Sequence, residues 1–221
     1  MATDPDQPNP VTDLARETVR ALAEGRSASI DDAILRAYDV TGVDARTRRP
    51  TRAELRAHAQ AHEESEHGEA GRLLRIDATL EEAGEVLATL EATVLARESD
   101  GMSLPAPEVY GRAARGLFDL DPVVHVRVTT SLSAAVLAQA LFDAGFDDPT
   151  CGSIETRYGR IDEIAFEGEF ARYRILRIPP RMGVDPSCDV VRGNRVDHAD
   201  FTTLAALRSR QCRGLPPHGE R

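Results

Sequence analysis

The chain has 221 residues, a formal net charge of −10 and no tryptophan, and all 27 of its basic residues are arginine. That length suffices for one large or two small domains with a core that needs no metal or disulfide. The acidic balance argues against non-specific binding to nucleic-acid backbones, and the lack of lysine excludes a Schiff base or a P-loop lysine.

The remaining composition points to a cytoplasmic protein. Three widely spaced cysteines without CxxC spacing argue against both a disulfide framework and a zinc knuckle. No apolar run approaches the roughly 20 residues of a membrane span, and no signal peptide opens the sequence. We therefore expect no membrane association. The cysteines are Cys151, Cys188 and Cys212.

The first half of the chain is predicted to be helical. Ser29 followed by Asp32, and Thr51 followed by Glu54, have the spacing of capping boxes, in which side chain and backbone cap a helix start reciprocally. We expect disordered tails at 1–10 and 211–221 and a helical leader over 11–98. The predicted helices of the leader run over about 12–24, 29–42, 52–66 and 69–98.

The last of these helices carries an apolar stripe and most of the acidic charge. Its apolar residues recur at spacings of three, four or seven, which predicts packing of one face against the following domain. Residues 60–100 hold 11 acids against three arginines, a balance of −8. The acidic faces of 69–98 are expected either to be solvated or to dock a basic protein partner.

Residues 105–210 change to a mixed pattern. Val123–Thr129 alternates and is rich in β-branched residues, which predicts a strand. The fold class expected is α+β, with a helical segment followed by a small mixed or antiparallel sheet and flanking helices. Further helices are predicted at about 131–144 and 199–210, and further strands at about 153–158, 161–167 and 172–178.

The run VYGRAARGLFDLDPVVHVRV, with the elements after it, resembles the polymerase-beta-like nucleotidyltransferase superfamily in its small bacterial form. That family carries a Gly-Ser turn that holds the triphosphate, a second Gly, and a strand with two Asp that hold two Mg²⁺ ions. The resemblance implies nucleotide binding at Gly111, Arg112, Gly116 and His125. Arg112 stands where the family has Ser, and Val123 and His125 stand where it has the two Asp.

These departures predict impaired catalysis. Mg²⁺ requires hard oxygen ligands; valine supplies none and imidazole is a poor ligand for this ion. An arginine in place of the Ser still suits a phosphate contact. We therefore expect a nucleotidyltransferase-like pseudoenzyme that binds a nucleotide or a protein partner, with no metal site.

An active enzyme with relocated carboxylates is the first alternative. Asp119, Asp121, Asp162 and Glu163 are the candidate catalytic residues, and Mg²⁺ would be the cofactor only in this case. Pro122 favours a turn for Asp119 and Asp121. If the protein is not an active enzyme, all four acids are expected to be solvated turn residues. A non-enzymatic protein-interaction module is the second alternative.

Two further groups of side chains have an ordinary and a functional interpretation. His58 and His62, four apart on a helix, form either a solvated face or a Zn²⁺ or Ni²⁺ site. The strand arginines pair across strands with Glu167 or Glu169, or line an anion groove with Arg112 and Arg115. These arginines are Arg172, Arg174, Arg177 and Arg181.

Overall fold

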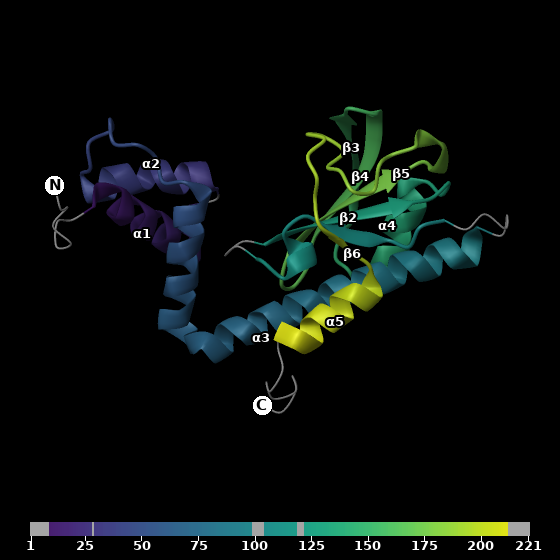
Figure 1. Ribbon diagram of the computed structural model, residues 1–221, viewed down its shortest axis with the longest axis horizontal. Coiled ribbons are helices and arrows are strands. Elements are labelled where there is room, and N and C mark those ends of the chain that lie inside the picture. The colour runs from purple at the N-terminus through teal and green to yellow at the C-terminus, as the bar shows by residue number, and fades with distance from the viewer. Residues whose placement is uncertain (1–8, 28, 99–103, 119–121, 212–221) are drawn as a thin grey trace. The chain divides into compact units, whose positions relative to one another are not determined.

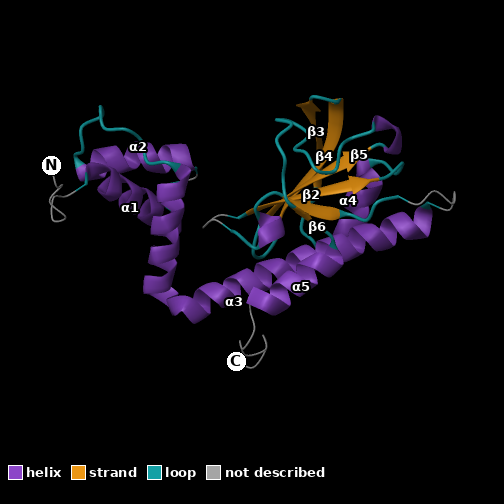
Figure 2. Ribbon diagram, in the orientation of Figure 1, coloured by secondary structure: helices purple, strands orange, loops and turns teal. Residues whose placement is uncertain are grey.

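The computed structural model describes residues 9–27, 29–98, 104–118 and 122–211. Over these residues it contains five α-helices and a six-stranded mixed sheet, which confirms the α+β class (Figure 1, Figure 2). The chain forms two compact units, Met1–Arg72 and Leu73–Arg221, each described by itself below. None of the described helices is both long and apolar enough to cross a membrane.

The first unit begins with two helices, α1 (Pro10–Ala23) and α2 (Ile30–Thr41). The Asn9 side chain accepts the Val11 N–H at 3.0 Å, and the Ser29 hydroxyl accepts the Asp32 N–H at 3.2 Å, so each helix start has a capped amide. The apolar faces of the two helices are buried. Their fully or nearly buried residues are Leu14, Ala15, Val19, Ala21, Ala33, Ile34 and Ala37.

The next helix, α3 (Arg52–Arg97), is interrupted at Gly68, whose φ of 70° and ψ of 170° are not helical. The sequence predicted two helices separated near this position, and the break is confirmed. The capping box at its start is also confirmed: the Thr51 N–H donates to Glu54 at 2.8 Å, and the Glu54 N–H donates to the Thr51 hydroxyl at 3.2 Å. The unit boundary lies within α3, so its part from Leu73 onward belongs with the sheet.

The sheet of the second unit has the strand order β3-β4-β5-β2-β1-β6. Its two central strands, β2 and β5, are parallel, and the other neighbours are antiparallel. The short strands β1 and β6 were not predicted from the sequence. The strands are β1 (Glu108–Tyr110), β2 (Val123–Thr129), β3 (Thr150–Thr156), β4 (Gly159–Glu167), β5 (Arg172–Ile178) and β6 (His198–Ala199).

One face of this sheet is covered by helices. The second part of α3, α4 (Ala134–Asp143) and α5 (Phe201–Gln211) share an apolar core with the strands, and α5 lies beside α3 (Figure 1). The predicted packing of the long helix against the mixed domain is thus confirmed. The opposite face has a smaller apolar cluster beneath the segment 182–196, made of Tyr110, Ile161, Leu176, Ile178 and Val190.

The acidic charge of α3 is not uniformly solvated, which departs from the simpler expectation. Glu82 is only 8% exposed, and both oxygens of its carboxylate accept hydrogen bonds from the turn between β4 and β5. Asp77 is 9% exposed and pairs with Arg208 of α5. The helix therefore uses these acids to hold other parts of the second unit.

Candidate functional site

The sheet face opposite the helices carries a group of polar side chains on four neighbouring strands. Alternation sends Val124, Val126 and Val128 into the helix-covered core, so the residues between them point to the other side. We call the following set the polar face: Tyr110 of β1, His125 and Arg127 of β2, Arg174 of β5 and Glu163 of β4.

Strand register brings the polar face together around His125. His125 lies opposite Tyr110 on the antiparallel neighbour β1 and beside Arg174 on the parallel neighbour β5. The Tyr110 and His125 rings have centroids 5.5 Å apart, and the Arg127 guanidinium lies 5.2 Å from the Tyr110 ring centroid. Burial raises the pKa of Tyr110 to about 12.

The charge state of the polar face follows from burial and neighbouring charges. Burial, and then the positive charge of Arg174, lower the pKa of His125 below its usual 6.5, against an opposing effect of Asp189. The imidazole is therefore neutral near pH 7 and can donate one hydrogen bond and accept another. The Arg174 side chain is 54% exposed and pairs with Glu163 at 3.6 Å, so its guanidinium remains open to solvent.

Arg127 has a structural role that the sequence did not reveal. It is 5% exposed and donates to the carbonyl oxygens of Asp185, Pro186 and Cys188 at 3.3, 3.0 and 2.8 Å. These bonds fix the segment 182–196 over part of the polar face. Alternation in β2 could have placed Arg127 beside His125, but no sequence signal identifies its distant acceptors.

Of the four proposed catalytic carboxylates, the structure describes Asp162 and Glu163, and it does not bring these two together. Asp162 and Glu163 are consecutive in β4, inside the strand predicted over about 161–167, so they are not the turn residues of the alternative interpretation. Consecutive strand residues point to opposite faces. Asp162 accordingly pairs with Arg177 at 3.3 Å, and Glu163 pairs with Arg174. Asp119 and Asp121 lie outside the described residues.

Two of the β5 arginines, Arg174 and Arg177, pair with other acids than the expected Glu167 or Glu169. Glu167 lies opposite Arg172 in the strand register, but the ion pairs of Arg174 and Arg177 are made with residues near the middle of β4. The backbone N–H of Glu169 donates to Glu82. Among the described residues, no group of three or more His, Cys, Asp or Glu side chains is arranged to hold a metal ion, including the region of His58 and His62.

The glycine turn predicted to bind a nucleotide lies between β1 and β2. Gly111 follows Tyr110 directly, so the turn begins at the edge of the polar face, and Arg112 is exposed. The Gly111 N–H donates to the Asp197 carbonyl at 2.7 Å, and the Gly116 N–H donates to the Ala113 carbonyl at 2.9 Å. Both amides are thus used within the chain.

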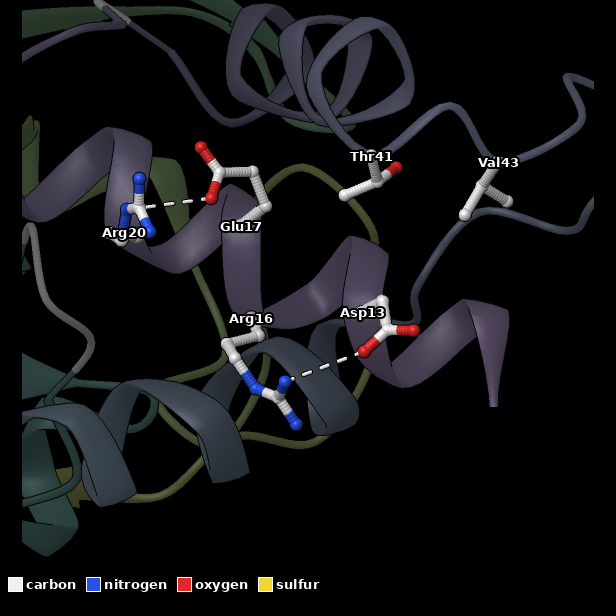
Figure 3. Close-up of a pocket in the computed structure, with 6 residues that line it drawn as sticks. All are labelled: Asp13, Arg16, Glu17, Arg20, Thr41 and Val43. Atoms are coloured by element: carbon white, nitrogen blue, oxygen red, sulfur yellow. Dashed lines mark hydrogen bonds and ion pairs between the residues drawn. The ribbon is translucent and has the colours of Figure 1, made fainter. Parts of the chain in front are cut away.

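A pocket of about 350 Å³ lies in the first unit, lined by charged side chains of α1 and by Thr41 and Val43 (Figure 3). Its charges pair with one another: Arg16 with Asp13 at 3.5 Å and Arg20 with Glu17 at 3.5 Å. Because these charged groups pair with each other, they do not mark the pocket as a ligand site. The polar face is therefore the stronger candidate for a functional site.

A scan of the sequence against models of known protein families finds no match, and a comparison with curated proteins finds none either. Any functional conclusion about this chain therefore depends on its own residues and their geometry.

Proposed function

We propose that this protein is a nucleotidyltransferase-like binding protein that holds an anionic ligand of the nucleotide type at the polar face and does not perform metal-dependent transfer. The observation that carries the proposal is the neighbouring position of His125 and Arg174 on the parallel central strands β2 and β5. In the family that the sequence resembles, this corner of the sheet carries carboxylates.

His125 and Arg174, in place of the family's carboxylates, change the chemistry of this part of the sheet. A neutral imidazole and a guanidinium supply hydrogen-bond donors, and the guanidinium supplies a positive charge, so this arrangement repels Mg²⁺ and attracts phosphate. Arg174 is the residue expected to make the principal phosphate contact, because its side chain is 54% exposed and its ion pair with Glu163 is long, at 3.6 Å. His125 supplies a second, uncharged donor.

The proposal predicts nucleotide binding that needs no divalent cation. The test is calorimetric titration of the full chain with ATP, once in EDTA and once in Mg²⁺. Arg174→Ala is expected to weaken ATP binding by about tenfold or more, the size expected for a charged hydrogen bond. Arg160→Ala is the matched control, because Arg160 lies on the adjacent strand β4 at a position that alternation turns to the other face.

A transfer assay completes the test. Incubation with labelled nucleoside triphosphates and Mg²⁺ or Mn²⁺ is expected to give no incorporation into protein or nucleic acid. Incorporation that Asp162→Asn abolishes would establish the enzyme with relocated carboxylates instead. Failure of ATP and the other common nucleoside triphosphates to bind the unmodified chain would refute the proposal.

A further inference from the structure

The C-terminal segment, defined as residues 197–211 and containing β6 and α5, contacts the glycine turn Gly111–Gly116 at both ends. At the first end, the Asp197 carbonyl accepts the Gly111 N–H at 2.7 Å. At the second end, the side-chain amide of Gln211 donates to the Arg115 carbonyl at 3.1 Å. The segment therefore occupies one N–H and one carbonyl oxygen of the turn.

The Gln211 side-chain amide packs directly against Gly116. Gly116 has a φ of +67°, and the amide of Gln211 lies so close to its Cα that a Cβ there would overlap the amide. The Oε1 atom of Gln211 is buried and has no hydrogen-bond partner in the described part of the chain. The contact therefore leaves the buried Oε1 acceptor of Gln211 unsatisfied. The free-energy cost of that unsatisfied acceptor favours release of Gln211 from the turn.

The helix that carries Gln211 is held to the rest of the second unit by apolar side chains and by one arginine. Leu204 is the one residue of α5 that is fully buried. The other main anchor is Arg208, which donates to Asp77 at 2.7 and 2.9 Å and to Glu81 at 2.9 Å, across to α3 beside it (Figure 1). Leu207 also packs against the core, Phe201 lies against Gly84 of α3, and Arg208 is partly buried. A terminal helix with these few contacts opens more readily than the central strands β2 and β5.

We propose that the C-terminal segment is an intramolecular cover of the glycine turn, latched by Arg208, and that its release admits the ligand to the turn. This inference rests on the proposed function in one respect: the ligand is taken to be the triphosphate group of a nucleotide. The cover itself depends only on the contacts of Asp197, Arg208 and Gln211. The two parts are therefore tested separately.

The cover is tested without ligand by hydrogen exchange of the full chain. Arg208→Gln is expected to accelerate exchange of the Gly111 amide and of residues 201–211 by about tenfold or more, while β2 and β5 keep their protection. Gln211→Ala, which removes the side-chain amide that donates to the Arg115 carbonyl, is expected to accelerate exchange in the same turn. Gln139→Ala is the matched control, because Gln139 is an exposed helical glutamine on α4 bonded to Asp143. Unchanged exchange of the Gly111 amide in both variants would overturn the cover.

The ligand is tested with sodium tripolyphosphate in EDTA by calorimetry. Arg208→Gln and Gln211→Ala are each expected to bind it about fivefold or more tightly than the unmodified chain, because less free energy is spent on opening. Loss of the Arg208 charge alone would weaken anion binding, so tighter binding reports release. Equal affinities in all variants would overturn the cover and leave the proposed function standing. Faster exchange without tripolyphosphate or ATP binding in any variant would support the cover and refute the proposed function.

Discussion

Replacement of Glu82 is expected to destabilise the second unit strongly. Its carboxylate accepts the Tyr173 hydroxyl at 3.0 Å and the Phe170 N–H at 3.2 Å, and also the N–H of Glu169. Tyr173 is 1% exposed, so its hydroxyl has no access to water once the carboxylate is gone. Burial, with the nearby charge and hydrogen bond of Glu82, raises the pKa of Tyr173 far above 10, which keeps the hydroxyl protonated as a donor.

The size of the effect follows from these three bonds. A hydrogen bond to a charged group contributes about 1.5–3 kcal/mol, and a buried donor left unsatisfied costs about 1–3 kcal/mol. The two backbone amides belong to exposed residues and can find water, so the Tyr173 hydroxyl dominates the loss. We expect Glu82→Ala to lower the free energy of unfolding by about 3–4 kcal/mol, and Glu82→Gln, which keeps an acceptor oxygen, by about 1–2 kcal/mol.

The assay is equilibrium urea unfolding followed by tyrosine fluorescence and far-ultraviolet circular dichroism. Glu85→Ala on the exposed side of α3 is the matched control, and its effect is expected to stay within about 0.5 kcal/mol. A double-mutant cycle with Tyr173→Phe isolates the hydroxyl–carboxylate bond. A loss for Glu82→Ala below about 1 kcal/mol, or no larger than that of the control, would refute the reasoning.

Three further results are expected. By NMR titration the imidazole of His125 should have a pKa below 6.5. Because the unfolded chain then binds more protons at this group than the folded chain does, the contribution of His125 to the free energy of unfolding is present above pH 6.5 and is lost as the pH falls below it. Arg127→Met should make the segment 182–196 the first site of limited proteolysis, because three hydrogen bonds to its carbonyl oxygens are lost; unchanged cleavage there would show that other contacts hold the segment. In single-cysteine variants, exposed Cys151 should react with a disulfide reagent faster than Cys188, which is partly buried and donates to a carboxylate, and equal rates would contradict that order.

Local elements of the fold could be predicted because their causes are local. The Thr51–Glu54 capping box, the strand Val123–Thr129 and the break near Gly68 each depend on a few consecutive side chains, and each is present. The strands β1 and β6, of three and two residues, were missed because pairing with distant partners defines them rather than any pattern of their own.

The candidate site was predicted only in part. His125 and Gly111 were identified from the motif, and the structure places Gly111 beside Tyr110 at the edge of the polar face. Arg174 was recognised from the sequence as part of a group of arginines. Its position beside His125 follows from the parallel pairing of β2 with β5, which brings together residues about 50 positions apart in the chain. The predicted strand over about 161–167 already implied opposite faces for Asp162 and Glu163, but their partners Arg177 and Arg174 follow from the pairing of β4 with β5.

By itself, the sequence determined the α-helices and the longer strands, the capping box of Thr51 and Glu54, and that no pair of acids stands in the strand after the glycine turn. Capping, periodicity and residue chemistry act over a few residues, so they can be seen in the order of amino acids. Only the tertiary structure decided which side chains meet: Glu82 with Tyr173, Arg127 with the 185–188 carbonyls, and Gln211 with the glycine turn. Those contacts depend on strand register and on helix packing between distant segments, which short-range patterns do not specify.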